Sequence, residues 1–296
     1  MGCSGGRSPN NPDFDALWDY GDPVATEAQF RALLADETRE LSRDTQIQII
    51  TQIARTLGLQ QKYDQAHALL DSIEPEVSLE PTLPQVRYQL ERGRVYNSSQ
   101  DKESALGYFR DALGNALLIG ADYFAVDAAH MLAIASPPNQ ALDWNLRALA
   151  LAETSDDPRT ETWVGSLYNN IGWTYHDQEK YRKALEMFEL ALDYRQKQGD
   201  VEAIRIARWC IARTYRSLNI YDEALKIQRE LAAQQVDQKL EPDGYISEEI
   251  GECLLALGQP EAAKPHFRTA AQLLSQDIWL VQNVPERLER LELLGQ

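Results

Sequence analysis

The sequence predicts an all-α fold, a right-handed superhelical solenoid of about six helix-turn-helix repeats with capping helices at both ends. Three observations lead to this prediction. A pattern of five residue types recurs six times, its copies lie 36 to 43 residues apart, and a tyrosine or proline stands at the start of several second helices. Each period is long enough for two helices and their turns but too short for an independent domain.

The recurring pattern begins with a small residue. An aromatic residue or leucine follows three positions later and an alanine twelve later; a bulky residue then follows at sixteen and a small or apolar residue at nineteen. The copies are Ala54, Leu57, Ala66, Leu70, Ile73; Gly93, Tyr96, Ala105, Phe109, Ala112; Ala129, Leu132, Ala141, Asn145, Ala148; Gly172, Tyr175, Ala184, Phe188, Ala191; Ala212, Tyr215, Ala224, Gln228, Leu231; and Gly251, Leu254, Ala263, Phe267, Ala270.

This spacing has a physical interpretation. We expect the small residue of each first helix to lie where the alanine of the second helix approaches most closely. The bulky residue comes four positions after that alanine, on the same helical face, and is expected to fill the space between neighbouring hairpins. Asn145 and Gln228 depart from the pattern, and there Trp144 and Ile227 are expected to take the buried place.

The elements follow in order along a single predicted domain, residues 13–296. Residues 1–12 are rich in Gly, Ser, Asn and Pro and are expected to form a disordered tail. An N-terminal cap over 13–43 contains the cluster Phe14, Leu17 and Trp18, a break at Gly21-Asp22-Pro23 and a helix over 26–42. Six repeats occupy about 44–275. A closing helix over 276–296 carries an apolar stripe from Ile278 to Leu291, in which Pro285 kinks the helix or begins its main part.

The residues at the predicted starts of the second helices agree with these repeat boundaries. Tyr63, Tyr181 and Tyr221 each stand just before the alanine that anchors a second helix, and Pro260 takes the same place in the sixth copy. Proline is tolerated at the first position of a helix, where its missing N–H is not needed.

The copy from Trp163 to Asp200 carries Gly172, Tyr175, Ala184, Phe188 and Ala191, and this order resembles the tetratricopeptide repeat family. The resemblance covers residues 45–275. The alanines step by 39, 36, 43, 40 and 39 residues, longer than the basic repeat of about 34. Such long repeats are similar to those of kinesin light chains and of bacterial peptide-sensing or transcription-regulating proteins. The resemblance implies a partner-binding scaffold.

Composition restricts the partners and the compartment. A net charge of -17 argues against nucleic-acid binding, which needs clustered Lys and Arg. No apolar run reaches the roughly 20 residues of a membrane-spanning helix, and we expect a bacterial cytoplasmic protein. The alternative is a lipid anchor at Cys3, because Gly2-Cys3-Ser4 resembles a lipoprotein cleavage site, although the hydrophobic signal does not precede it.

The sequence predicts no catalytic residues, metal site or cofactor. Signatures of nucleotide, zinc-protease and serine-hydrolase sites are not found. His67, His130, His176 and His266 have no second His or Cys at metal-ligand spacing and are interpreted as structural or surface residues. Cys210 and Cys253 are expected to be small core residues. Glu248, Glu249 and Glu252 are expected to form a solvated helical face.

The candidate groove comes from the resemblance, since first helices line the groove in this family. The residue after each small anchor is Arg55, Arg94, His130, Trp173, Arg213 or Glu252, a mostly basic and aromatic row in an acidic protein. Neighbouring positions on the same faces extend the predicted partner-binding set, which is Asn169, Asn170, Trp173, His176, Trp209, Arg213, Arg216, Arg94 and Arg55. Asn170 matches a position where relatives often hold a ligand's backbone.

Two interpretations of this row remain. In the first, arginines pair with a partner's carboxylates and tryptophans anchor it. In the second, the tryptophans are buried between repeats and the arginines bind the protein's own carboxylates. The predicted function is a non-enzymatic scaffold that binds an extended peptide or partner helix. The alternative is a regulatory sensor of a peptide or small molecule whose solenoid changes curvature on binding.

Overall fold

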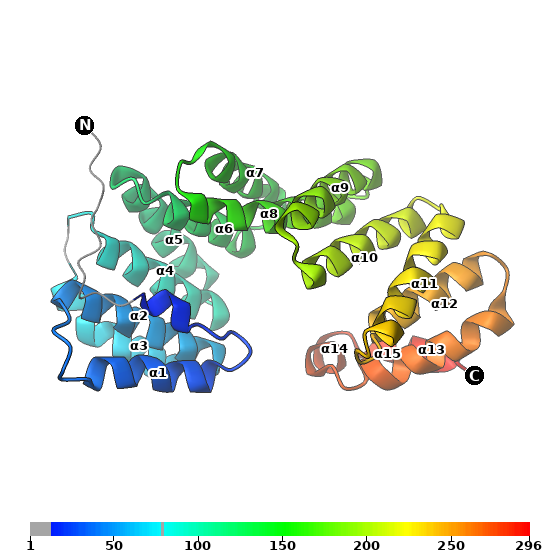
Figure 1. Ribbon diagram of the computed structural model, residues 1–296, viewed down its shortest axis with the longest axis horizontal. Helices are drawn as coiled ribbons and strands as arrows, with labels where there is room; N and C mark the ends of the chain where they lie inside the picture. Colours follow the sequence, from blue (N-terminus) through cyan, green and yellow to red (C-terminus); the bar gives the residue numbers. More distant parts are fainter. Residues whose placement is uncertain (1–12, 78–79) are drawn as a thin grey trace. The chain divides into compact units, whose positions relative to one another are not determined.

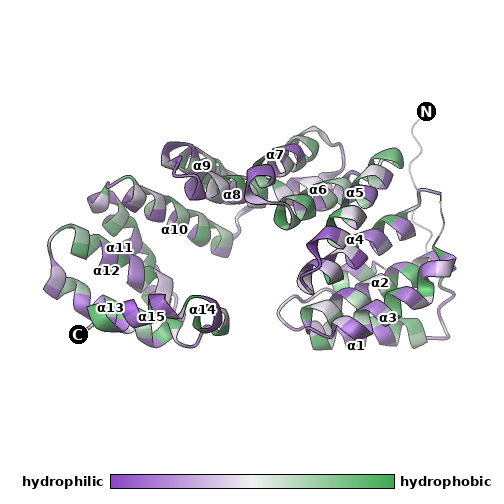
Figure 2. Ribbon diagram, turned by 180° about the vertical axis from the view of Figure 1, so that it is seen from behind, coloured by the Kyte–Doolittle hydropathy of each residue, from purple (hydrophilic) through white to green (hydrophobic). Residues whose placement is uncertain are grey.

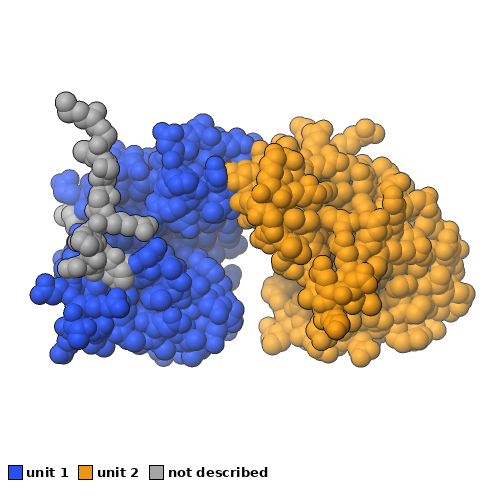
Figure 3. All heavy atoms as spheres, in the orientation of Figure 1, with its two compact units in different colours: residues 1–163 blue, residues 164–296 orange. Residues whose placement is uncertain are grey.

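The all-α prediction is confirmed. The computed structural model describes residues 13–77 and 80–296, and within these ranges it contains fifteen α-helices, three short 3₁₀ helices and no β-strand (Figure 1). The predicted tail over residues 1–12 lies outside the described residues. The chain groups into two compact units, Met1–Trp163 and Val164–Gln296 (Figure 3). The single domain over 13–296 stays a prediction.

Among its described residues, the first unit contains three short 3₁₀ helices, the N-terminal helix α1 and three consecutive hairpins. Within each hairpin the two helices pack against one another, and the first helices α2 and α4 also pack together. The elements are η1 (Phe14–Leu17), α1 (Pro23–Ala35), α2 (Arg43–Leu59), α3 (Tyr63–Ile73), η2 (Glu74–Glu76), α4 (Leu83–Ser98), α5 (Lys102–Leu118), α6 (Asp122–Ala135), α7 (Pro138–Thr154) and η3 (Pro158–Thr160).

The second unit continues the same packing of successive helices. The boundary between the units falls within α8 (Glu161–Asp177). The remaining elements are α9 (Tyr181–Gln198), α10 (Val201–Ser217), α11 (Tyr221–Asp237), α12 (Gly244–Ala256), α13 (Pro260–Leu274), α14 (Ile278–Asn283) and α15 (Pro285–Leu294). Figure 2 shows hydrophobic and hydrophilic residues side by side on the helices, as expected of amphipathic helices. None of the described helices is long and apolar enough to cross a bilayer.

Most of the predicted anchors lie in the core. Five of the six alanines are fully buried, and the second helices begin where predicted, at Tyr63, Tyr181, Tyr221 and Pro260. Ala141 is the exception and is only half-buried. Phe188 is fully buried in a cluster with Cys210 and Ile211 of the next hairpin. The bulky residue therefore fills the space between hairpins, as the spacing predicted.

The small residue has a different neighbour from the one we expected. A Cβ added at Gly93, Gly172 or Gly251 would lie 2.5, 2.6 or 2.8 Å from a ring carbon of the phenylalanine sixteen residues later. The glycine is therefore required by Phe109, Phe188 or Phe267, not by the alanine. Where the bulky position holds Leu70, Asn145 or Gln228, the small residue is alanine. The pattern consequently contains a coupled pair, glycine with phenylalanine or alanine with a smaller side chain.

The prediction that Trp144 and Ile227 replace the bulky residue is wrong. Asn145 and Gln228 are themselves buried, whereas Trp144 and Ile227 are only half-buried, so the helices keep the register of the other copies. Asn145 Oδ1 and both polar atoms of the Gln228 amide have no hydrogen-bond partner among the described residues. Unpaired buried amides destabilise a core, because their hydration is lost without replacement.

The turns within the hairpins share one geometry. Seven residues after the small anchor, the backbone adopts positive φ at Gln61, Gln100, Glu179, Asn219 and Gly258. The next residue's N–H donates to the carbonyl of the residue five positions earlier, at 2.9 Å in each of the five turns. This bond closes the end of the first helix in the manner of a Schellman motif. The third hairpin lacks it, because Ser136 is extended (φ -75°) before Pro137 and Pro138.

The two caps differ in part from expectation. Helix α1 ends at Ala35, not at Ser42; Ser42 instead caps α2, its side chain accepting a hydrogen bond from the Thr45 N–H. Pro285 begins α15, and the chain bends there after α14, in agreement with the prediction. Leu280 and Leu291 are buried, but Ile278 is 72% exposed, so the predicted apolar stripe is only partly covered.

Candidate functional site

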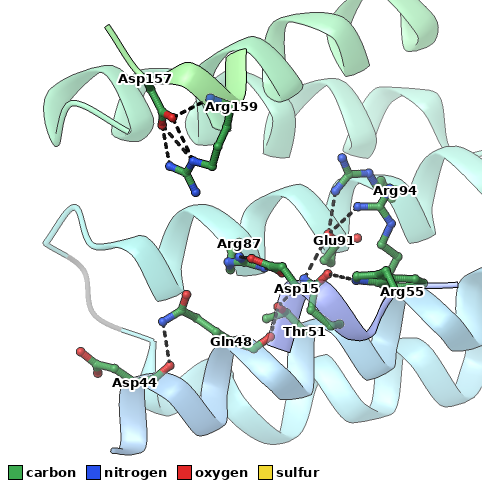
Figure 4. Close-up of polar contacts among 12 residues, drawn as sticks. Asp15, Asp44, Gln48, Thr51, Arg55, Arg87, Glu91, Arg94, Asp157 and Arg159 are labelled. Carbon is green, nitrogen blue, oxygen red and sulfur yellow. Dashed lines mark hydrogen bonds and ion pairs between the residues drawn. The ribbon is translucent and has the colours of Figure 1, made fainter. Parts of the chain in front are cut away.

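The first helices of the first unit carry an ion network (Figure 4). Arg94 of α4 donates to Asp127 of α6 at 2.6 Å and to Glu91, one turn earlier on α4, at 2.6 Å. Arg55 of α2 lies 3.6 Å from the same Glu91 oxygen. Gln52, also on α2, points its amide nitrogen at that oxygen, 3.5 Å away. Three successive first helices are thus joined by charges on one face.

The network fixes the protonation of Arg94 and Asp127. Burial lowers the pKa of Arg94, but the charges of Asp127 and Glu91 outweigh burial and raise the pKa above its ordinary value. Burial raises the pKa of the Asp127 carboxyl, yet Arg94 and Arg55 hold it below its usual range. Both groups are therefore ionised at neutral pH, and the pair is a permanent feature of the face.

The N-terminal segment Asp13–Tyr20 lies against this face. Asp15 of η1 accepts hydrogen bonds from both terminal nitrogens of Arg87 of α4, one of them at 3.0 Å. The Trp18 indole N–H donates to Gln52 Oε1 at 3.0 Å. The guanidinium of Arg55 lies 5.4 and 5.3 Å from the ring centres of Trp18 and Tyr20. The segment thus contacts α2 and α4 through charged and aromatic groups.

A cavity of about 460 Å³ lies between this segment and the helices. Its lining includes the N-terminal residues Asp15, Trp18 and Tyr20, the helix residues Gln52, Arg55, Arg87, Glu91 and Asp127, and the residues Tyr123, Phe124, Arg159 and Thr162. The guanidinium of Arg87 lies 4.8 Å from the Phe124 ring centre, and that of Arg159 lies 5.0 Å from that of Tyr123. Cavities of this size hold small ligands or short peptide segments in other proteins.

Two polar atoms in the cavity wall lack partners. Arg87 Nε and Glu91 Oε2 are buried and have no hydrogen-bond partner among the described residues, and the two side chains belong to residues only 6% and 2% exposed. One atom is a donor and the other an acceptor. Both residues line the cavity, and the two atoms themselves are buried.

The second unit contains an equivalent ion cluster. Arg216 of α10 donates two hydrogen bonds to Glu249 of α12, at 2.7 and 2.9 Å, and Arg213 lies 3.1 Å from the same carboxylate. Arg213 and Glu249 are separated by 36 residues, as are Arg55 and Glu91. In both pairs the arginine follows the small anchor of one repeat and the glutamate lies two positions before the anchor of the next.

The four predicted groove arginines, Arg55, Arg94, Arg213 and Arg216, are therefore bound by carboxylates of the chain itself. For the arginines, this agrees with the second interpretation of the row, in which they bind the protein's own carboxylates. Their contact with a partner stays a prediction.

The predicted tryptophans gather in one aromatic cluster of the second unit. Trp173 packs edge-on against Phe188 and His176, with ring centres 5.3 and 5.1 Å apart, and lies 6.0 Å from Trp209. His176 Nε2 lies 3.0 Å from the Ser217 hydroxyl. Burial, followed by the charges of Arg213 and Arg216, lowers the pKa of His176 to about 4, so this imidazole is neutral at pH 7.

Asn169 and Asn170 line a separate cavity of about 230 Å³ in the second unit. The Cys210 thiol donates to Asn169 Oδ1 at 3.4 Å. The structure thus brings Asn169 to α10, and neither asparagine belongs to the lining of the first unit's cavity. A role for either one in holding a peptide backbone stays a prediction.

Two further expectations from the sequence can be scored. The expectation that Glu248, Glu249 and Glu252 form a solvated face is wrong, because Glu248 and Glu249 are buried. Each of the three carboxylates accepts a hydrogen bond from an arginine. Arg287 of α15 binds Glu248, and Arg290 of α15 binds Glu252. The cysteine interpretation is confirmed, because Cys210 and Cys253 are buried and burial raises the pKa of each thiol to about 12. Such thiols are poor nucleophiles at neutral pH.

Sequence reasoning missed Asp15, Arg87, Asp127 and the aromatic residues of the cavity. Arg87 comes six residues before Gly93, outside the five-position pattern, and its partner Asp15 is 72 residues away. A signal existed for Asp127, since it stands two positions before Ala129 just as Glu91 and Glu249 precede their glycines.

The matches to known proteins agree with this fold. Residues 125–197, from α6 into α9, match the family model of the tetratricopeptide repeat. No curated protein sequence matches the chain significantly. The solved structure of apo RapI has a TM-score of 0.69 at 12% identity, covering 89% of this chain and 76% of RapI.

Two more solved structures are similar. A putative kinesin light chain of Podospora anserina, with nearly identical TPR-like repeats, has a TM-score of 0.55 at 15% identity, covering 68% of this chain and 99% of that one. NprR in complex with its cognate peptide NprX has a TM-score of 0.56 at 15% identity, covering 95% and 81%. The resemblance to long-period tetratricopeptide repeats, including those of kinesin light chains and bacterial regulators, is confirmed; identities this low show the fold alone.

Proposed function

We propose that this tetratricopeptide-repeat chain is a non-enzymatic binding module that takes up an extended peptide in the cavity of its first unit. The observation that carries the proposal is the pair of unsatisfied atoms in the cavity wall, Arg87 Nε and Glu91 Oε2. A peptide backbone presents N–H donors and carbonyl acceptors at short, regular intervals, so a segment that reaches these two atoms satisfies both.

The lining of the cavity supports the same class of ligand. Arg55, Arg87 and Arg159 present cationic groups that already lie close to aromatic rings. Guanidinium groups recognise carboxylates through paired hydrogen bonds, and aromatic walls bury apolar side chains. Only one of the similar structures described above is a peptide complex, that of NprR with its cognate peptide, and it supplies the precedent on this fold.

The test blocks the cavity without changing its charged residues. Thr162 is an exposed residue of the cavity lining, and Thr162→Trp places an indole at that point. Thr154→Trp is the matched control, since Thr154 is an exposed residue of α7 that does not line the cavity.

Random twelve-residue peptides displayed on phage are selected against the full chain, and the recovered peptides are titrated against both variants. We expect Thr162→Trp to weaken their binding at least ten-fold and Thr154→Trp to leave it unchanged. Equal binding to the two variants, or recovery of no peptide, would contradict the proposal.

A further inference from the structure

The N-terminal segment Asp13–Tyr20 has the features of a ligand held by its own protein. We propose, building on the peptide-binding function above, that this segment occupies part of the site as an internal competitor. The partner it competes with is a peptide carrying an acidic residue and, three positions later, an aromatic one.

The contacts of Asp15 are asymmetric. The Arg87 side chain is 7% exposed and belongs to the folded repeats, whereas the Asp15 side chain is 46% exposed. The arginine is therefore fixed in the wall, and the carboxylate approaches it from the solvent side. Any carboxylate delivered along the same path makes the same two hydrogen bonds.

Trp18 provides the second point of attachment. A 3₁₀ turn places residues i and i+3 on the same side, and η1 thereby directs Asp15 and Trp18 to the same face of the repeats. The indole N–H reaches Gln52 Oε1, and the ring lies beside the Arg55 guanidinium. The acidic residue, the spacing and the aromatic residue together define the recognised motif.

The charges of the site require an external or internal anion. Among the described residues of the repeats, three carboxylates face Arg55, Arg87, Arg94 and Arg159, those of Glu91, Asp127 and Asp157. Asp15 supplies the fourth negative charge. When the segment leaves, Arg87 loses the only carboxylate that pairs with it among the described residues, so a buried cation remains that favours an acidic ligand.

Apolar contacts also hold the segment on the first unit. Phe14 is buried in the cluster around Phe30, and the Trp18 ring packs edge-on against Phe30 with centres 5.5 Å apart. A partner peptide must therefore compete with a covalently attached segment, which lowers its apparent affinity by the fraction of molecules that are open.

The experiment uses the full chain and a fluorescently labelled synthetic peptide, DFDALWDYG, which has the sequence of residues 13–21. Asp15→Arg repels the attached segment from Arg87 and opens the site. Asp111→Arg, on the exposed face of α5, makes the same charge change elsewhere. Asp15→Arg with Arg87→Asp restores the attached pair with reversed charges and removes the cation from the wall.

Fluorescence anisotropy should show that Asp15→Arg binds the peptide at least ten-fold more tightly than the wild type. The Asp111→Arg variant should match the wild type, and the double variant should bind no more tightly than the wild type. Thermal melting of each variant verifies that it is folded; if Asp15→Arg is unfolded, Trp18→Ala replaces it as the opened form, with the same expected gain.

Equal affinities of the wild type and a folded opened variant would overturn the internal competitor. That result leaves the peptide-binding function standing if phage-selected peptides still lose affinity in Thr162→Trp. Conversely, loss of the Thr162→Trp effect contradicts the binding function itself, so the two failures are distinguishable.

Discussion

Replacing Gly172 by alanine tests the coupled pair that defines the even-numbered repeats. The new Cβ would lie 2.6, 2.8 and 2.9 Å from three atoms of the Phe188 ring, closer than real Cβ contacts. The ring is fully buried and cannot turn away. Overpacking of this kind costs roughly 1–3 kcal/mol. Alanine is also about 1 kcal/mol more favourable than glycine in a helix, so the net loss in the free energy of unfolding is up to about 2 kcal/mol.

The control separates the two contributions. Gly107 lies on α5 with nothing within 4 Å of an added Cβ, so Gly107→Ala receives the propensity gain alone. We expect Gly107→Ala to raise the free energy of unfolding by about 1 kcal/mol. The two glycine variants should therefore differ by about 1–3 kcal/mol, the full steric cost. Urea unfolding followed by circular dichroism measures both.

A second substitution tests the cause. Phe188→Leu makes room at the ring, as Leu70 does opposite Ala54. In Gly172→Ala with Phe188→Leu, the two changes should be coupled favourably by at least about 1 kcal/mol. Equal unfolding free energies for Gly172→Ala and Gly107→Ala would refute the reasoning, as would strictly additive effects in the double variant. The bulkier substitution Gly172→Val should lower the free energy of unfolding by more than about 1 kcal/mol.

Two more predictions concern the second unit. Gln228→Met keeps the shape of a fully buried side chain and removes two polar atoms without partners, so urea unfolding should show a gain of about 1–3 kcal/mol; a loss would mean that the amide is satisfied. For His176, the folded pKa of about 4 is below the ordinary value of 6.5, so the unfolded chain binds more protons between these values. The stabilisation is complete above pH 6.5 and is lost as the pH falls toward 4. His176→Gln should therefore flatten the dependence of the unfolding free energy on pH over that interval, and an unchanged slope would contradict the shift.

The hairpins were predictable because their signals are local. The anchors, the helix starts at Tyr63 and Tyr181, and the position of Pro285 depend on residues within about one period of each other, and turn and helix rules apply at that range. The neighbour of Gly172 was predicted wrongly, since the choice between Ala184 and Phe188 depends on how far one helix is shifted along the axis of the other. The spacing of residues in the sequence does not specify that shift.

The candidate site was predictable only in part. Arg55 and Arg94 were found because they follow the anchors, but their partners lie on neighbouring first helices, 36 and 33 residues away. Asp15 lies 72 residues from Arg87, and no local pattern connects them. The carboxylate partners also affect how a charge-reversal variant of the second unit is interpreted.

Replacing Arg213 and Arg216 by glutamate would put three carboxylates together at Glu249. A loss of partner binding in that variant would therefore indicate a destabilised fold before it indicated a lost partner contact.

The alternation of glycine and alanine anchors indicates how such a chain can be lengthened or shortened. Gly93, Gly172 and Gly251 are spaced by 79 residues each, and each faces a phenylalanine, while the repeats between them use alanine. The modular unit of this protein is therefore a pair of hairpins. The polar residue two positions before the anchor does not follow this alternation, since Asp127 precedes Ala129 as Glu91 precedes Gly93. Excising 79 residues keeps the alternation of glycine and alanine repeats. Excising one hairpin places two repeats of the same kind next to each other.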